Sequence, residues 1–203
     1  MRLGNGARAR LLARMFTPNV SRRLALPAFL SLSFCAAALA ADRDWPVYLG
    51  DKAGSHYSTL DQITPENVGR LEVAWTFHAG DATDQTQIQC NPLVIDGVLY
   101  GTTPRLKVFA LDAATGKELW RFTPAEPNGV NRGLAYWTDG NDKRILFGAG
   151  KWLHAIDAKT GKLCEDFGEK GRVDLSEGLG RDVTGLAIQA NTPGVVYRDL
   201  IVM

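Results

Sequence analysis

The feature of this sequence that most constrains its fold is a segment that occurs twice. Residues 110–120 contain the pattern Asp-x-x-Thr-Gly-Lys, which begins at Asp112, and residues 155–165 repeat it from Asp157. Each copy follows a short, mostly apolar segment. Glycine supplies the left-handed backbone conformation that a tight turn needs, and the aspartate can accept hydrogen bonds from turn amides. The pattern therefore predicts a β-hairpin in each copy.

Further strand pairs precede each hairpin. Residues 92–95 and 98–101 flank an Asp-Gly turn, and residues 133–137 and 144–148 flank a polar turn at 139–142. The two copies are 45 residues apart, counted from Gly116 to Gly161, which is the period of one four-stranded propeller blade. Residues 192–202 begin a third copy. We predict an all-β fold, a β-propeller of which the chain holds about the first two and a half four-stranded blades. Because blades bury their faces against neighbours, we expect the chain to be part of a longer one.

The first 40 residues are predicted to be a signal peptide. Six arginines and no acidic residue precede Asp42. The apolar run 24–40 is shorter and more interrupted than a typical membrane-spanning segment. It ends in Ala38-Leu39-Ala40, the small-x-small pattern that signal peptidase cleaves. Residues 41–203 would then form the mature, periplasmic part, which is the truncated propeller domain.

Two other leader types and a later start are less favoured. Arg22-Arg23 weakly resembles a twin-arginine signal, but Ala25 stands where an aromatic residue is usual. Cys35 could indicate a lipoprotein anchor, but the bulky Phe34 precedes it. A start at Met15 would shorten the basic segment. Ordinary secretion is the preferred interpretation, with membrane association left open.

The charge and cysteine content exclude several classes. The sequence has 23 basic and 22 acidic residues; without the six arginines of the leader, 17 basic residues remain, and the mature part carries about −5. This does not suggest a nucleic-acid partner. The mature part has only Cys90 and Cys164, which we interpret as two isolated thiols. Its glycine-rich strings fit neither a dinucleotide-binding nor a phosphate-binding pattern.

Two residues of the repeat are predicted to be structural. Trp120 ends the first copy, and large rings at this position most often pack between blades. Glu165 replaces it in the second copy, so the next interface must be made differently. His154 occupies the position that Phe109 has in the first copy, which favours a packing role over metal binding.

Longer motifs resemble the quinoprotein dehydrogenases. Residues 57–68 (Tyr-Ser-Thr-Leu-Asp-Gln-Ile-Thr-Pro-Glu-Asn-Val), followed by Leu71 and Ala74-Trp75, are similar to that family's entry segment, and residues 92–100 with the hairpin after them are similar to its first blade. The resemblance covers essentially the whole mature part. It implies an eight-bladed propeller that holds pyrroloquinoline quinone (PQQ) and Ca²⁺ on its axis.

The motif Asn131-Arg132-Gly-Leu-Ala-Tyr-Trp resembles the segment whose arginine pairs with the quinone. PQQ carries carboxylates and carbonyl oxygens, which a planar, permanently charged guanidinium suits. The resemblance implies cofactor contacts by Arg132 and Asn131, by Gln89 where many members carry glutamate, and by Thr192. Arg132 could otherwise be an ordinary surface arginine. Thr192 precedes a proline, and a residue in this position also favours the extended backbone at the start of a strand.

Departures from the family pattern bear on the substrate. The alcohol type carries vicinal cysteines where this chain has Glu126 and Pro127, and the glucose type carries a histidine where it has Asn128. Residues 161–171 resemble the glucose type more closely. The resemblance implies oxidation of sugars or alcohols by hydride transfer to the quinone, with cytochrome c or ubiquinone as electron acceptor. It places the Ca²⁺ ligands and the catalytic aspartate beyond Met203.

The alternative is a non-enzymatic propeller scaffold of the outer-membrane assembly lipoprotein type. Such a scaffold shares the Asp-x-x-Thr-Gly hairpins. It predicts a lipobox cysteine at the mature start and no arginine motif on the axis. The sequence has Ala41 at the expected mature start and Arg132 in its motif, so the enzyme is the preferred hypothesis.

Overall fold

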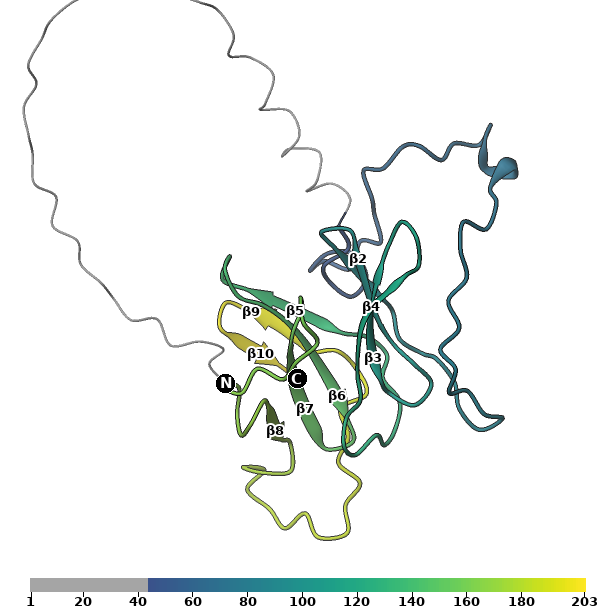
Figure 1. The fold of residues 1–203 in the computed structure, drawn as a ribbon. Helices are drawn as coiled ribbons and strands as arrows, with labels where there is room; N and C mark the ends of the chain where they lie inside the picture. The colour runs from purple at the N-terminus through teal and green to yellow at the C-terminus, as the bar shows by residue number, and fades with distance from the viewer. Residues whose placement is uncertain (1–43) are drawn as a thin grey trace, which may run out of the picture.

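The computed structural model describes residues 44–203, and the predicted signal peptide lies outside the described residues. The chain forms consecutive propeller blades in which all neighbouring strands are antiparallel (Figure 1). The first blade contains β1 (Leu93–Ile95), β2 (Val98–Thr102), β3 (Val108–Asp112) and β4 (Glu118–Phe122). The second contains β5 (Ala135–Thr138), β6 (Lys143–Ala149), β7 (Trp152–Asp157) and β8 (Arg172–Asp174). A hairpin of β9 (Val195–Tyr197) and β10 (Leu200–Val202) begins a third. The prediction of two and a half blades is confirmed.

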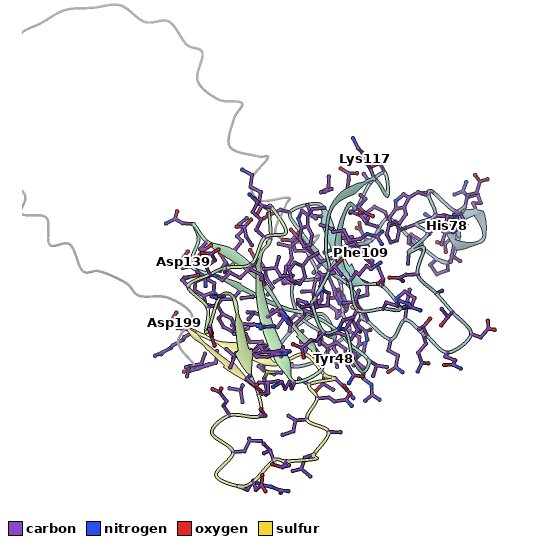
Figure 2. The ribbon with its side chains drawn as sticks, turned by 60° about the horizontal axis from the view of Figure 1, so that its bottom comes forward. Tyr48, His78, Phe109, Lys117, Asp139 and Asp199 are labelled. Atoms are coloured by element: carbon purple, nitrogen blue, oxygen red, sulfur yellow. The ribbon has the colours of Figure 1, made fainter. Side chains whose placement is uncertain are left out.

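The strand order gives the blades two unlike ends. The β1–β2, β3–β4, β5–β6 and β9–β10 turns lie at one end, where Lys117, Asp139 and Asp199 mark three of them at the periphery of the molecule (Figure 2). At the other end β1, β5 and β9 begin, the β2–β3 and β6–β7 connections reverse the chain, and the chain passes from one blade to the next. We call this end the loop face. One short 3-10 helix, η2 (Val68–Arg70), precedes the blades, and no helix within residues 44–203 combines the length and apolarity needed to cross a bilayer.

The hydrophobic core is shared between blades. Leu93 and Val108 of the first blade and Ile145 and Ile156 of the second are completely buried in one cluster. A second cluster joins the second blade to the β9–β10 hairpin, whose Ile201 packs against it. Neighbouring blades therefore bury apolar side chains that neither could bury alone, which is how propeller and repeat folds are stabilised.

The two repeated hairpin turns have the predicted geometry. Gly116 and Gly161 both have φ of +71°, in the left-handed region. The backbone N–H of Thr115 donates to Oδ1 of Asp112 over 2.8 Å, and that of Thr160 donates to Asp157 over 2.7 Å. The repeated sequence thus forms the same turn twice.

The predicted packing of Trp120 between blades is confirmed. Its indole Nε1 donates to the carbonyl oxygen of Ala158 in the second blade over 3.0 Å. Its ring lies so close over Gly161 that a Cβ there would be 2.7 Å from a ring carbon. Any side chain at Gly161 would therefore clash with the ring, so the glycine serves the interface as well as the turn.

Trp75 makes the same contacts one repeat earlier. It precedes Trp120 by 45 residues, donates from Nε1 to the carbonyl oxygen of Ala113 over 3.1 Å, and lies over Gly116. Residues 71–77 thus occupy the place of an outer strand beside the first blade, but they form no strand ladder with any part of the described chain.

The second hairpin departs from the prediction on its returning side. After the turn only Leu163 bridges back to Ile156, and β8 forms later, where Arg172 pairs with His154. Residues 164–171 form turns between these points. The deviation has a packing reason, because it inserts the ring of Phe167, which is 1% exposed, into the second core cluster.

The interface after the second blade uses a different tryptophan, as expected from Glu165. Trp137 of β5 is buried, and its Nε1 donates to the carbonyl oxygen of Arg198 in the β9–β10 turn over 3.0 Å. The guanidinium of Arg144 lies 5.2 Å from the Trp137 ring. This contact joins the second blade to the β9–β10 hairpin.

His154 packs in the core, as its repeat position predicts. It is 3% exposed, and its ring stacks on Phe147 with centroids 4.8 Å apart. Burial, helped by the positive charge of Arg172, lowers the pKa of His154 to about 4. The imidazole is therefore neutral in the folded protein at neutral pH.

We expect His154 to make the protein sensitive to mild acid. Its pKa is lower in the folded state than the usual 6.5 of the unfolded state, so its contribution to stability is complete above about pH 6.5 and is lost as pH falls toward 4. The contribution lost between pH 7 and pH 5 is on the order of 2 kcal/mol. His154→Phe should lose less stability over this interval, as measured by urea unfolding at both pH values. His154→Leu is a second, smaller apolar replacement, and curves parallel to wild type for both would contradict the assignment.

Candidate functional site

Two of the predicted cofactor residues meet on the loop face. Arg132 lies between the loop that leaves the first blade and the start of β5, and it is exposed. Its Nε donates to Oε1 of Gln89 over 3.1 Å, although the two residues are 43 positions apart. In the described part of the chain the Arg132 guanidinium forms no ion pair. Its charge is thus held in place by a neutral amide.

The backbone of Arg132 joins the entry points of three blades. Its N–H donates to the carbonyl oxygen of Asn191 over 2.8 Å, and its carbonyl oxygen accepts from the N–H of Asn91 over 3.0 Å. The side-chain amide of Asn91 donates to the same oxygen over 3.2 Å. Because Asn91 precedes β1 and Asn191 precedes β9, the three first strands of successive blades are linked next to Arg132.

The side chain of Asn131 makes its hydrogen bonds to the second blade and to the segment that enters it. It is 3% exposed, its Nδ2 donates to the carbonyl oxygen of Gly148 over 3.2 Å, and its Oδ1 accepts from the N–H of Gly133 over 3.0 Å. These two bonds fix the chain on both sides of Arg132. Asn131 therefore positions Arg132, and its predicted contact with a cofactor stays a prediction.

Thr192 lies at the same face but is not bonded to the Arg132–Gln89 pair. It is exposed and follows Asn191, which binds the Arg132 backbone. Its hydroxyl has no hydrogen-bond partner within residues 44–203. The structure thus brings three predicted residues to one place and leaves the fourth beside them.

The arrangement is suited to an anionic or carbonyl-rich ligand. An exposed guanidinium offers several N–H donors in one plane, which match carboxylate and carbonyl oxygens. Gln89 adds an amide N–H₂ that stays free to donate, because the bond to Arg132 uses its oxygen. These donors fit PQQ. Among the described residues, no group of three His, Cys, Asp or Glu side chains could hold a metal ion.

Sequence reasoning missed Asn91 and Asn191. Both stand at blade entries just before proline-containing segments, Asn91-Pro92 and Asn191-Thr192-Pro193. Their shared position, one or two residues before a proline at a blade entry, could have identified them. Their partner was not predictable, because the hydrogen bonds are made to the backbone of a residue in another blade.

The fold defines a class, the β-propellers built from four-stranded antiparallel blades. The sequence matches, over residues 45–203, the PQQ family, described as "Glucose/ethanol/alcohol dehydrogenase, beta-propeller domain". The chain belongs to this family.

Individual relatives include enzymes for several substrates. The chain is 33% identical to the glycerol dehydrogenase large subunit of Gluconobacter oxydans (strain 621H), an alignment that covers 82% of this chain and 25% of the relative. It is 32% identical to quinoprotein glucose dehydrogenase A of Acinetobacter calcoaceticus, covering 80% and 24%. It is 44% identical to the dehydrogenase subunit of the quinone alcohol dehydrogenase of G. oxydans, covering 59% and 16%. The chain thus spans about a quarter or less of the length of these relatives.

A solved structure has the same fold. The quinohemoprotein alcohol dehydrogenase of Comamonas testosteroni superposes with a TM-score of 0.63 at 26% identity, covering 82% of this chain and 23% of that one. The blades described above are therefore arranged as in a quinoprotein dehydrogenase propeller.

Proposed function

We propose that these residues form part of a periplasmic PQQ-dependent dehydrogenase that oxidises sugars or alcohols and passes electrons to an acceptor such as cytochrome c or ubiquinone. The observation that carries the proposal is the pairing of Arg132 with Gln89. The Arg132 guanidinium is exposed and has no carboxylate partner in the described residues. We assign PQQ as the ligand of this pair because the chain belongs to the PQQ family.

Each residue of the site has a distinct task. Arg132 binds and orients carboxylate or carbonyl oxygens of the cofactor, and its permanent charge stabilises anionic character there. Gln89 fixes the guanidinium without neutralising it, and Thr192 is placed to add a hydroxyl contact. Asn131 and the backbone bonds to Asn91 and Asn191 keep Arg132 in register with the blades.

The remaining chemistry needs groups beyond these residues. When bound, PQQ supplies the acceptor for the hydride of the substrate carbon. We place the Ca²⁺ ligands and the base that takes the hydroxyl proton outside residues 44–203, as the family resemblance implies. The role of residues 44–203 is to bind and orient the cofactor.

The proposal predicts a dye-reducing enzyme. The intact protein, reconstituted with PQQ and Ca²⁺, should reduce an artificial electron acceptor when D-glucose, glycerol or ethanol is added, and omission of PQQ should abolish the rate. Absence of dye reduction with all three substrates, in a folded protein that binds PQQ, would contradict the proposed activity. Failure to bind PQQ as well would favour the scaffold alternative.

A further inference from the structure

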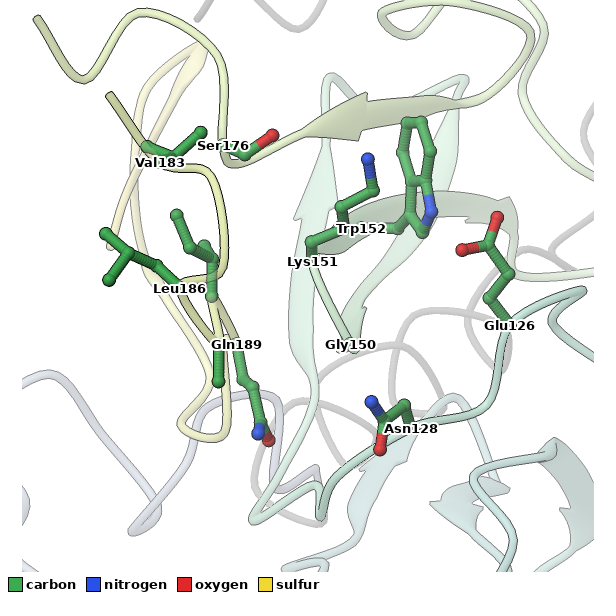
Figure 3. A pocket seen from close by; sticks show the side chains of 11 residues that line it. Glu126, Asn128, Gly150, Lys151, Trp152, Ser176, Val183, Leu186 and Gln189 are labelled. Atoms are coloured by element: carbon green, nitrogen blue, oxygen red, sulfur yellow. The ribbon is translucent and has the colours of Figure 1, made fainter. Parts of the chain in front are cut away.

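The loop that leads from β4 to β5 holds the one asparagine of the described residues that is followed by glycine, Asn128-Gly129. Both residues are exposed. The carbonyl oxygen of Asn128 accepts from the N–H of Gly150 over 2.8 Å, which holds this part of the loop against the β6–β7 turn. Figure 3 shows the Asn128 side chain among those that line a cavity of about 390 Å³. Water can therefore reach the side chain.

The side chain of Asn128 and the backbone nitrogen that follows it are both free to react. The Asn128 amide makes no hydrogen bond within residues 44–203. The N–H of Gly129 donates to no acceptor in the same part of the chain. Because glycine has no Cβ, nothing on Gly129 itself hinders the approach of its nitrogen to Cγ of Asn128. The loop thus leaves an electrophile and its neighbouring nucleophile unprotected.

The reaction that these two groups can undergo needs only water. Hydroxide removes the proton of the Gly129 amide, the nitrogen forms a bond to Cγ of Asn128, and the bond from Cγ to Nδ2 breaks, so that ammonia leaves with a proton from water. The product is a five-membered succinimide. Water then adds to one of its two carbonyl carbons and breaks the bond from that carbon to the nitrogen, which regains its proton. Opening at Cγ gives aspartate, and opening at the main-chain carbon gives isoaspartate.

The β5–β6 turn shows how the fold protects another exposed asparagine. Asn141 is exposed like Asn128, and the nucleophile next to it would be the backbone nitrogen of Asp142. The N–H of Asp142 donates to Oδ1 of Asp139 over 2.8 Å. That hydrogen bond keeps the nitrogen occupied, and the side chain of Asp142 adds a Cβ that Gly129 lacks. Asn141 is therefore an internal reference for the reactivity of Asn128.

Packing keeps glycine at position 129. A Cβ there would lie 2.3 Å from Oε1 of Gln189, and the φ of +90° lies in the left-handed region that other residues rarely adopt. The fold therefore requires the residue that makes Asn128 reactive. Position 128 also lies four residues before Arg132, whose guanidinium has no ion-pair partner in the described residues.

We propose that Asn128 is a site of spontaneous deamidation, a modification that replaces a neutral amide on the loop face by a carboxylate. Aspartate or isoaspartate at this position adds one negative charge near Arg132, and isoaspartate also lengthens the main chain between β4 and Arg132. The added charge weakens the attraction of Arg132 for an anionic ligand. This consequence for PQQ rests on the proposed function, whereas the modification itself does not.

Peptide mapping of the intact apoprotein by mass spectrometry tests the modification. The folded protein is incubated in neutral and in mildly alkaline buffer, and isoaspartate is quantified by enzymatic methylation of the digested peptides. We expect deamidation to be several-fold faster at Asn128 than at Asn141. It should also be faster in the alkaline buffer, because hydroxide removes the amide proton. A synthetic peptide of residues 123–134, incubated in the same way, gives the rate without the fold.

A matched pair of variants identifies the nucleophile. Gly129→Ala combined with Gln189→Ala keeps Asn128, adds a Cβ beside the attacking nitrogen and removes the group with which this Cβ would clash. The double variant should deamidate several-fold more slowly, while Gln189→Ala alone should react like wild type. Far-ultraviolet circular dichroism checks that each variant is folded. The proposal would be overturned by an intact Asn128 in the folded protein while the peptide reacts, by equal rates at Asn128 and Asn141, or by an unchanged rate in the double variant.

Asn128→Asp reproduces one product and measures its effect on the cofactor site. Its dissociation constant for PQQ should be about threefold to tenfold higher than that of wild type, the effect of one added charge near Arg132. Asn128→Gln should bind PQQ like wild type. Equal affinity of Asn128→Asp and wild type would refute the effect on the cofactor and leave the modification. Deamidation at Asn128 in a protein that binds no PQQ would refute the proposed enzyme and leave the modification.

Discussion

Replacing Arg132 with alanine is expected to raise the dissociation constant for PQQ on the order of 100-fold, because hydrogen bonds to charged groups contribute about 1.5–3 kcal/mol. The fold should survive, since the Arg132 side chain is exposed and bonds only to Gln89, while the blade contacts are made by its backbone. The amount of quinone retained after gel filtration measures the first effect, and urea unfolding measures the second.

Two further variants sharpen this prediction. Arg132→Lys keeps the charge but loses the planar set of donors, so its affinity should lie between those of wild type and Arg132→Ala. Arg70→Ala removes an exposed arginine at the end of η2 and should bind PQQ like wild type. Equal retention by Arg132→Ala and Arg70→Ala would show that Arg132 does not hold the cofactor.

Trp120→Ala is expected to lower the free energy of unfolding by about 3–5 kcal/mol, the usual cost of removing a large packed aromatic side chain. The variant loses the packing over Gly161 and the contact with Tyr100, whose ring centroid lies 5.9 Å away. It also leaves the carbonyl oxygen of Ala158 without its Trp120 donor. Such a loss is a large fraction of the stability of a typical domain.

The neighbouring Leu119 supplies the matched control. It lies in the same strand but is 51% exposed, so Leu119→Ala should change the free energy of unfolding by no more than about 0.5 kcal/mol. Urea unfolding of both variants compares them directly. Similar unfolding curves for the two variants would mean that Trp120 does not stabilise the interface between blades.

The repeat made the strands and turns predictable. The hairpins at Gly116 and Gly161 follow from local chemistry, because a left-handed turn position and an aspartate acceptor are readable from neighbouring residues. The packing of Trp120 and His154 followed from comparing the two copies. The equivalence of Trp75 could have been found in the same way, since it lies one period before Trp120.

The remaining features depend on contacts between distant residues. The interruption before β8 places Phe167 in a core cluster built partly from another blade, which no local pattern indicates. The pairing of Arg132 with Gln89 joins the entry segments of two blades. The pocket in Figure 3 gathers Glu126, Trp152 and Gln189 from three separate segments. The conformations of the loops decide which of these residues come into contact, and the loop sequences do not repeat with the period of the blades.

An equilibrium titration shows whether Arg132 and Gln89 hold PQQ at the loop face of the propeller. PQQ is added to the intact apoprotein in the presence of Ca²⁺, and binding is followed by the absorbance of the quinone. We predict saturable binding of one quinone per protein molecule that is strongly weakened in Arg132→Ala. The absence of saturable binding to the folded protein, or the same affinity in wild type and Arg132→Ala, would show that Arg132 does not hold PQQ.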